Sequence, residues 1–276
     1  MNAFLWARGS VRWALFLLLS NWIVVHVLVL RVWHFDGSPR TDDSQLCFVD
    51  ALLTMLGVGV EWRSSVEHFI FWSFHVAEAA LAYCWLWCVF ADPGFLSKEL
   101  ASASDADEWP PALRAQYCRR SRRCVERMDH FCVWIGQPVG ARNHKTFLIY
   151  TALSLVLLLF DALALWTRLA EIVIAALLFQ SLPADAATHA VPVLLFAALY
   201  SACAYSVLAL FLLQCELIYR DETTFEWLTR MRANKERRHG DGGGAAPPND
   251  WRNVRRFFGE NWLEILNIHR AVPPTH

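Results

Sequence analysis

Charge is scarce in this chain. Charged residues make up 18% of its 276 residues, while hydrophobic residues make up 56%. A soluble domain is about 45–50% apolar, so the composition argues against a soluble protein. The formal net charge of −1 carries no signal as a total, and we expect no nucleic-acid partner. The first apolar run is too long for a signal peptide and no small-residue cleavage site follows it, so we expect no cleavable signal.

Paired cysteines are also lacking. The chain has eight cysteines, but four of them lie inside or at the edge of apolar runs: Cys84, Cys88, Cys203 and Cys215. Three more, Cys118, Cys124 and Cys132, lie in a basic loop that we place in the cytosol, where thiols stay reduced. Cys47 alone has a plausible lumenal position, and it has no partner there. We therefore expect no disulfides.

Long apolar runs are abundant. A bilayer core of about 30 Å needs about 20 apolar residues in a helix, and four segments qualify: Trp13–Leu30, Phe69–Ala91, Phe147–Trp166 and about Val191–Leu217. Two shorter runs, Phe48–Val60 and Leu169–Leu182, are too short to span, and we interpret them as interfacial or re-entrant helices. The sequence predicts an all-α integral membrane protein with four transmembrane helices.

The basic residues predict the orientation. Nine Lys and Arg residues lie between the second and third spans, and ten follow the fourth. Because basic loops stay on the cytosolic side, we expect both termini to be cytosolic. The predicted regions are a cytosolic N-terminus (1–12), spans one and two with a lumenal loop (13–91), a cytosolic cysteine-containing domain (92–146), spans three and four (147–218) and a cytosolic tail (219–276).

Ionisable residues interrupt two spans. His75 and Glu78 lie one turn apart on one helix face, and Asp161 and Arg168 lie two turns apart. Such residues are candidates for function, but we favour the interpretation that they neutralise each other between helices or snorkel to the interface.

The tail divides into two parts. Arg230–Asp250 is charged and then rich in Gly and Pro, which predicts a flexible linker. Apolar residues then recur at helical spacing from Trp251 to Leu266, which predicts one amphipathic helix. It would pack on an anionic membrane surface or on the cytosolic domain.

The cytosolic loop carries the candidate chemistry. Asp129 and His130 precede Cys132, so an imidazole can take the thiol proton while a carboxylate orients the imidazole. A free thiol with a pKa of about 8.5 is only slightly ionised at neutral pH. Spacing alone favours a reduced cysteine beside a surface histidine.

Five motifs in order resemble the DHHC protein S-acyltransferase (palmitoyltransferase) family. Asp92-Pro93-Gly94 resembles its DPG motif, and the run from Asp129 to Trp134 resembles its DHHCPW signature. Further resemblance lies in Gly140-x-x-Asn143-His144-Lys145 with Phe147, in Thr223-Thr224-Phe225-Glu226 for the TTxE motif, and in Asn253 with Phe257 and Gly259. These matches cover nearly the whole chain.

The departures concern zinc. The family carries two structural zinc sites, and here Cys118 and Cys124 match one ligand of each. Other ligand positions hold Tyr117, Ser121, Phe131 and Pro138, and Ala101–Gln116 contains no cysteine. One ligand per site cannot hold a tetrahedral zinc, so we expect none. A rearranged site from Cys118, Cys124, His130 and His144 is an alternative that would use up the base. We expect Phe131 to be buried in a small apolar core with Val133, Trp134, Ile135, Pro138 and Val139.

The resemblance implies a two-step reaction. Cys132 would take a long-chain (palmitoyl) group from acyl-CoA, with His130 as base and Asp129 orienting it, and pass it to a cysteine of a membrane-proximal protein substrate. The acyl chain would lie among the spans. Thr224 would contact the Asp-His unit, Asn253 would brace the tail, and Trp134 belongs to the signature.

The expected co-substrate is acyl-CoA, with no permanently bound cofactor. Its phosphates would be held by Arg119, Arg120, Arg122 and Arg123, although the positive-inside bias explains these arginines equally. The expected location is the endomembrane system (Golgi or ER) or the plasma membrane. The alternative function is a catalytically inactive scaffold or partner subunit that retains the fold.

Overall fold

The computed structural model describes residues 57, 60–96, 113–177, 184–237 and 250–273. The predicted first span (Trp13–Leu30), Cys47 and the run Phe48–Val60 up to residue 59, apart from Gly57, lie outside these residues. By the contacts between its residues the chain divides into two compact units. The described residues of the first unit lie within Ala82–Ala152 and Ala209–His276, and those of the second within Leu15–Leu81 and Leu153–Leu208.

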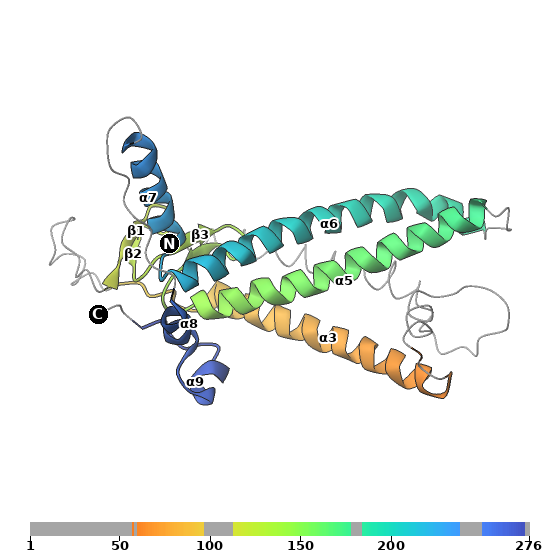
Figure 1. The fold of residues 1–276 in the computed structure, drawn as a ribbon, viewed down its shortest axis with the longest axis horizontal. Helices are drawn as coiled ribbons and strands as arrows, with labels where there is room; N and C mark the ends of the chain where they lie inside the picture. Colours follow the sequence, from red (N-terminus) through yellow and green to blue (C-terminus); the bar gives the residue numbers. More distant parts are fainter. Residues whose placement is uncertain (1–56, 58–59, 97–112, 178–183, 238–249, 274–276) are drawn as a thin grey trace. The chain divides into compact units, whose positions relative to one another are not determined.

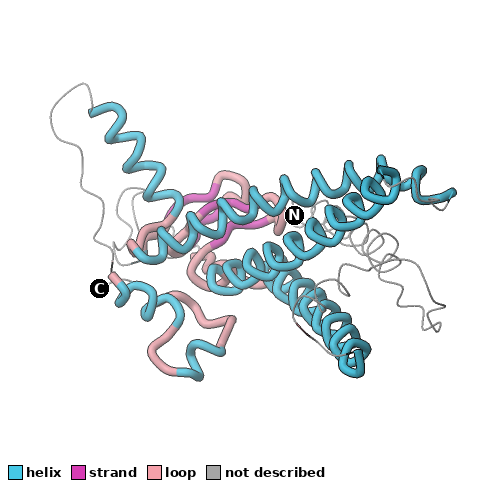
Figure 2. The backbone as a smooth tube through the Cα atoms, turned by 45° about the vertical axis from the view of Figure 1, so that its right-hand side comes forward, coloured by secondary structure: helices cyan, strands magenta, loops and turns pink. Residues whose placement is uncertain are grey.

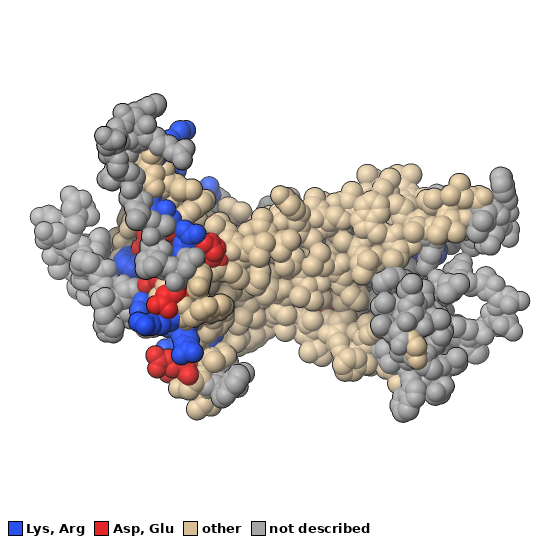
Figure 3. Space-filling view, viewed as in Figure 1, with Lys and Arg blue, Asp and Glu red and all other residues tan. Residues whose placement is uncertain are grey.

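Three long helices dominate the described residues (Figures 1 and 2): α3 (Val60–Phe90), α5 (His144–Leu177) and α6 (Ala184–Tyr219). Each contains a stretch long and apolar enough to cross a membrane: His68–Phe90, His144–Ile174 and Ala190–Tyr219. The second, third and fourth predicted spans are therefore apolar helices. Figure 3 shows the contrast in composition, because charged side chains gather over the strands and the tail helices while the long helices present other residues.

The helix ends differ from the prediction at one place. The run Leu169–Leu182 was expected to form a separate interfacial helix, but its residues up to Leu177 continue α5 without a break. The prediction was wrong for those residues because Arg168 and Glu171 are good helix formers, so polarity alone does not end the helix. Residues 178–183 lie outside the described residues.

The core of the second unit is apolar. Buried residues from all three helices form it, and they include Phe74, Leu165 and Ala197. Within α3, His75 Nδ1 lies 3.0 Å from Glu78 Oε2, so the two side chains pair one turn apart as predicted. Asp161 is buried, and its Oδ1 has no hydrogen-bond partner among the described residues.

The prediction of an all-α fold was wrong for the loop between α3 and α5, because this loop also contains β-strands. It contains two antiparallel hairpins: β1 (Gln116–Cys118) with β2 (Arg123–Val125), and β3 (His130–Cys132) with β4 (Gln137–Val139). Cys118 pairs with Arg123, and Cys132 with Gln137. The turn of the second hairpin uses Gly136 at φ 72°, a conformation that glycine adopts at no steric cost.

Two of the motifs hold this loop against the helix ends. Asp92 Oδ1 accepts hydrogen bonds from the backbone N–H groups of Gly94 and Phe95 at 3.0 and 2.8 Å. A β carbon at Gly140 would lie 2.5 Å from the carbonyl oxygen of Pro93. Only glycine fits there, so the segment after α3 and the segment before α5 approach backbone to backbone. Both segments lie beside the strands that carry the candidate site.

The tail forms three further helices: α7 (Thr224–Arg237), α8 (Trp251–Phe258) and α9 (Trp262–Leu266). The expected linker is therefore wrong over Arg230–Arg237, which are helical; residues 238–249 lie outside the described residues. The expected single amphipathic helix is wrong too. It breaks at Gly259, whose φ of 119° is incompatible with a right-handed helix.

The tail packs onto the start of α5. Phe257 is buried with Leu148, Ile218 and Val272. The ammonium of Lys145 is buried, and its three N–H groups are shared among four tail carbonyl oxygens at 2.7–2.9 Å, those of Phe258, Glu264, Ile265 and Asn267. The side chain of Asn253 donates to the Tyr219 carbonyl at 3.0 Å, so the expected contact of Asn253 with the core is present.

Candidate active site

Strand β3 sets the geometry of the candidate nucleophile. Successive side chains of a strand point to opposite faces, so His130 and Cys132 share one face and Phe131 takes the other. Cys132 is buried and His130 is partly exposed. The Cys132 side chain lies close enough to the His130 imidazole to help raise its pKa. The His-x-Cys spacing therefore brings a base to a thiol because the segment is extended.

Asp129 completes the site. Its carboxylate is fully buried and accepts a hydrogen bond from His130 Nδ1 at 2.6 Å. At the start of α7, Thr224 donates to the same carboxylate from its backbone N–H at 2.7 Å and from its hydroxyl at 2.9 Å. The expected contact between Thr224 and the Asp-His unit is present. A helix N-terminus also favours a negative charge.

The pKa values of the pair move apart. Burial alone would raise the pKa of Asp129, but the hydrogen bond and charge of His130 and the hydrogen bond from the Thr224 backbone hold it below its ordinary range. Burial alone would lower the pKa of His130, but its hydrogen bonds to Asp129 and Cys132 and their charges raise it to about 9. His130 therefore holds a proton more strongly than a free imidazole does, beside a carboxylate that is ionised at neutral pH.

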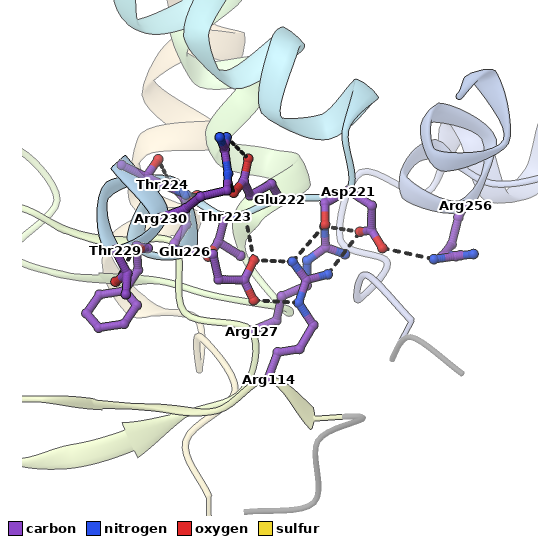
Figure 4. Close-up of polar contacts among 12 residues, drawn as sticks. Arg114, Arg127, Asp221, Glu222, Thr223, Thr224, Glu226, Thr229, Arg230 and Arg256 are labelled. Atoms are coloured by element: carbon purple, nitrogen blue, oxygen red, sulfur yellow. Dashed lines mark hydrogen bonds and ion pairs between the residues drawn. The ribbon is translucent and has the colours of Figure 1, made fainter. Parts of the chain in front are cut away.

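Behind this site, an ionic cluster fixes the turn that delivers Thr224 (Figure 4). Asp221 accepts from Arg127 at 2.8 Å, from Arg114 at 3.1 Å and from Arg256 at 3.0 Å. Arg114 also forms an ion pair with Glu226, whose pKa this arginine lowers against the effect of burial. The cluster ties the loop, α7 and α8 to the end of α6.

Backbone conformation supports a positioning role for this cluster. Arg114, Arg127 and Asp221 have φ values of 45°, 44° and 51°, which non-glycine residues rarely adopt. Such strained residues persist where surrounding interactions fix them. The sequence analysis did not single out any of the three for this role, because residues 114, 127 and 221 share no spacing signal.

The residues expected to bind acyl-CoA do not all lie beside the Asp-His unit. Arg119, Arg120, Arg122 and Arg123 are exposed on the turn of the β1–β2 hairpin. The guanidinium of Arg120 lies 5.3 Å from the Phe131 ring and that of Arg123 3.8 Å from the Phe95 ring. Trp134 is 60% exposed. Of the predicted binding residues, only Thr224 lies in contact with the Asp-His unit.

The expected apolar core of the loop is partly correct. Ile135, Pro138 and Val139 are buried. Val133 and Trp134 are more than half exposed, so the prediction was wrong for them. Phe131 is half-buried against Cys118, Val125 and Met128 rather than fully buried. As the strand alternation requires, it packs on the face away from His130.

The donors present do not fit a structural zinc. Tetrahedral zinc sites use four Cys or His ligands. Among the residues that the structure describes, no three His, Cys, Asp or Glu side chains come close enough together to hold a metal ion. The seven described cysteines are unpaired. A zinc-free loop remains a prediction, and no chemical step is derived through a metal.

Fold and site together define a class: a helical protein with apolar helices long enough to cross a membrane and a cysteine beside an Asp-His pair in the loop between two of them. Residues 108–231 match the family model of the DHHC palmitoyltransferases. The match covers a little under half of the chain and includes the candidate site, so this region is similar to the DHHC palmitoyltransferases.

Curated relatives carry the same family name or activity. Palmitoyltransferase erf2 of Emericella nidulans is 30% identical over 175 residues, 61% of this chain and 25% of the relative. Palmitoyltransferase AKR1 of Yarrowia lipolytica is 32% identical over 108 residues, 32% of this chain and 14% of the relative. Probable protein S-acyltransferase 12 of Arabidopsis thaliana is 28% identical over 150 residues, 45% of this chain and 51% of the relative. The chain therefore spans at most about half the length of these three relatives.

Proposed function

We propose that the chain is a protein S-acyltransferase that moves a long-chain fatty acyl group, such as palmitoyl, from acyl-CoA to protein cysteines. The observation that carries the proposal is the hydrogen bond from His130 to the buried Asp129 carboxylate, with Cys132 on the same face of β3 as His130. Similarity to the DHHC palmitoyltransferases supports acyl-CoA and a protein as the substrates. The DHFC form of the signature, with Phe131 in place of a second histidine, keeps all three of these residues.

In the first step, His130 takes the proton of the Cys132 thiol. Because its Nδ1 is engaged by Asp129, the other ring nitrogen is the one free to accept this proton. The sulfur attacks the thioester carbonyl carbon of acyl-CoA, and the bond from that carbon to the CoA sulfur breaks. CoA leaves as a thiol with the proton that His130 returns.

In the second step, His130 takes the proton of an acceptor cysteine. The acceptor sulfur attacks the acyl-Cys132 carbonyl carbon, and Cys132 leaves and recovers the proton. One thioester is exchanged for another in each step, so no ATP is consumed. Throughout, Asp129 stays ionised and stabilises the imidazolium.

The membrane arrangement is also part of the proposal. We propose four spans, with Trp13–Leu30 as the first, and with residues 92–146 and 219–276 and both termini in the cytosol. Basic residues concentrate in these cytosolic regions, which is the bias expected of cytosolic loops. In this arrangement the arginines of the β1–β2 turn are available to the CoA phosphates, and the acyl chain lies among the spans of an endomembrane or plasma membrane.

One experiment tests the chemistry. The purified full chain is incubated with a radiolabelled palmitoyl-CoA, and the product is treated with neutral hydroxylamine, which cleaves thioesters. We expect a hydroxylamine-labile adduct that peptide mass spectrometry maps to Cys132 and that Cys132→Ala lacks. If the folded chain forms no such adduct, the result supports the alternative function, a catalytically inactive scaffold or partner subunit that retains the fold.

A further inference from the structure

Asp129 also accepts a hydrogen bond from Gln214 of α6, whose side chain joins three groups behind the carboxylate. This side chain is fully buried. Its Nε2 donates to Asp129 Oδ2 at 2.8 Å and to the Thr224 hydroxyl at 3.2 Å. Its Oε1 lies 2.7 Å from His144 Nε2. Both amide protons and the amide oxygen of Gln214 are thus engaged.

His144 determines which way the Gln214 amide faces. Its Nδ1 has no hydrogen-bond partner among the described residues, so the proton that fits this arrangement sits on Nε2 and is donated to Gln214 Oε1. The amide nitrogen must then point at Asp129. With the amide reversed, its oxygen would face the carboxylate and Nε2 of His144 would face an N–H group, so both contacts would be lost.

The Asp129 carboxylate therefore has its full set of donors. One oxygen accepts from His130, Gln214 and the Thr224 hydroxyl, and the other accepts from the Thr224 backbone. A carboxylate held from several directions cannot rotate away from the imidazole. Since Asp129 is buried, each missing donor would leave part of its charge uncompensated.

We propose that Gln214 is a positioning residue of the proposed acyltransferase site, which acts through Asp129 to hold His130 against Cys132. This role rests on the proposed function. The arrangement of Gln214, Asp129 and His130 around Cys132 can nevertheless be tested by a measurement that needs no acyl-CoA. That readout is the reactivity of the Cys132 thiol. His130 increases this reactivity by taking the thiol proton.

The test uses two substitutions. Gln214→Met keeps an unbranched side chain of similar length and removes both donors. Gln214→Glu keeps the shape, and while the introduced carboxyl is protonated it can still donate to Asp129. Once ionised it cannot donate, and it repels the Asp129 carboxylate. The titratable and charged groups around this position are Asp129 and His130 from the loop, His144 from α5 and, further out, Arg127.

The measurement is the rate of alkylation of Cys132 by iodoacetamide in the full chain, from pH 6 to pH 9, quantified by peptide mass spectrometry. Each rate is divided by the wild-type rate at the same pH. For Gln214→Met we expect a ratio reduced roughly 10- to 100-fold at neutral pH, the equivalent of a lost hydrogen bond to a charged group. For Gln214→Glu we expect a ratio close to one at pH 6 that falls about tenfold as the introduced carboxyl ionises, since burial beside Asp129 raises its pKa.

Gln116→Glu is the matched control, because it makes the same Gln-to-Glu change on strand β1, away from the Asp129 carboxylate. Its ratio should stay near one at every pH. The proposal is overturned if Gln214→Met alkylates within about twofold of wild type. It is also overturned if Gln214→Glu is slowed by one constant factor across the pH range, which is the mark of general loss of structure.

The same preparations are assayed for autoacylation, which separates the two proposals. A pH-dependent ratio with no wild-type acyl adduct leaves Gln214 as the positioning residue of a reactive thiol and refutes the acyltransferase. An acyl adduct on Cys132 with wild-type rates for both Gln214 variants supports the acyltransferase and refutes the role of Gln214.

Discussion

Replacing Asp221 with asparagine is the sharpest test of how the loop is held. Asparagine tolerates the left-handed backbone that the φ of 51° requires, so Asp221→Asn removes the charge without new strain. Arg127 is only 5% exposed in its side chain and loses its paired carboxylate. Removing one partner of a buried ion pair costs about 3–5 kcal/mol. Because asparagine retains one acceptor oxygen, we expect about 3 kcal/mol, the lower end of that range.

The assay is thermal unfolding of the full chain in detergent, followed by tryptophan fluorescence. At about 2–4 °C per kcal/mol for a chain of this size, Asp221→Asn should lower the apparent Tm by roughly 6–12 °C. Arg256→Gln is the matched comparison. It removes an arginine from the same carboxylate, but this arginine is 38% exposed, and exposed pairs contribute only about 0–1 kcal/mol.

The double variant Arg127→Gln with Asp221→Asn completes the cycle. With both partners gone, no unpaired charge remains buried between them, so the double variant should lose less stability than the sum of the two single variants. An Asp221→Asn chain that melts within about 1 °C of wild type, against the several degrees expected, would refute the reasoning. So would additive losses.

Four further outcomes follow from the site. Cys132→Ser should abolish autoacylation and transfer, because a serine hydroxyl has no comparable activation here; normal transfer would exclude Cys132 as nucleophile. His130→Ala should slow formation of the acyl-enzyme by roughly 10²–10⁴-fold, and a loss below about tenfold would remove His130 from the mechanism. The Asp129–His130 pair should stabilise the fold fully between about pH 4 and 6.5. That stability is lost as the pH rises through about 9, where folded His130 loses its proton. It is also lost as the pH falls below the ordinary range of Asp129. The difference in Tm between wild type and His130→Ala, followed across pH, measures this contribution. Metal analysis should find well under one zinc per chain, and two zinc ions per chain would refute the interpretation of the ligand positions. Phe131→His should lower stability by roughly 1–3 kcal/mol, because an added imidazole lacks a hydrogen-bond partner. Added zinc should restore neither stability nor activity of this variant.

The sequence predicted the long helices well because the bilayer imposes a length on apolar runs. It was less successful at their ends. Hydropathy marks where apolar residues stop, but α5 continues through Arg168 and Glu171 because backbone hydrogen bonds and helix propensity extend beyond the apolar stretch. The tail shows the reverse error. Its apolar spacing is continuous, while the single backbone conformation at Gly259 divides it into α8 and α9.

The site was predicted where its residues are adjacent in sequence. Asp129, His130 and Cys132 lie within four residues. The extended strand puts His130 and Cys132 on one face, and Asp129 is next to His130 in the sequence. Thr224 was found through the family resemblance. Gln214 was missed because it lies in an apolar span, 85 residues from Asp129, with no local spacing to mark it. Side chains that act from a distant element become visible only when the fold brings the elements together.

The buried ammonium of Lys145 has a practical consequence for shortened versions of the chain. Its four acceptors are main-chain oxygens of the last 19 residues, from Phe258 onward. Deleting that stretch removes all four of these acceptors from a buried cation in the first turn of α5. A chain that ends near residue 257 should therefore lose stability as it would from a damaging substitution in the core. If such a chain fails to express, the failure says nothing about whether the tail recognises substrate.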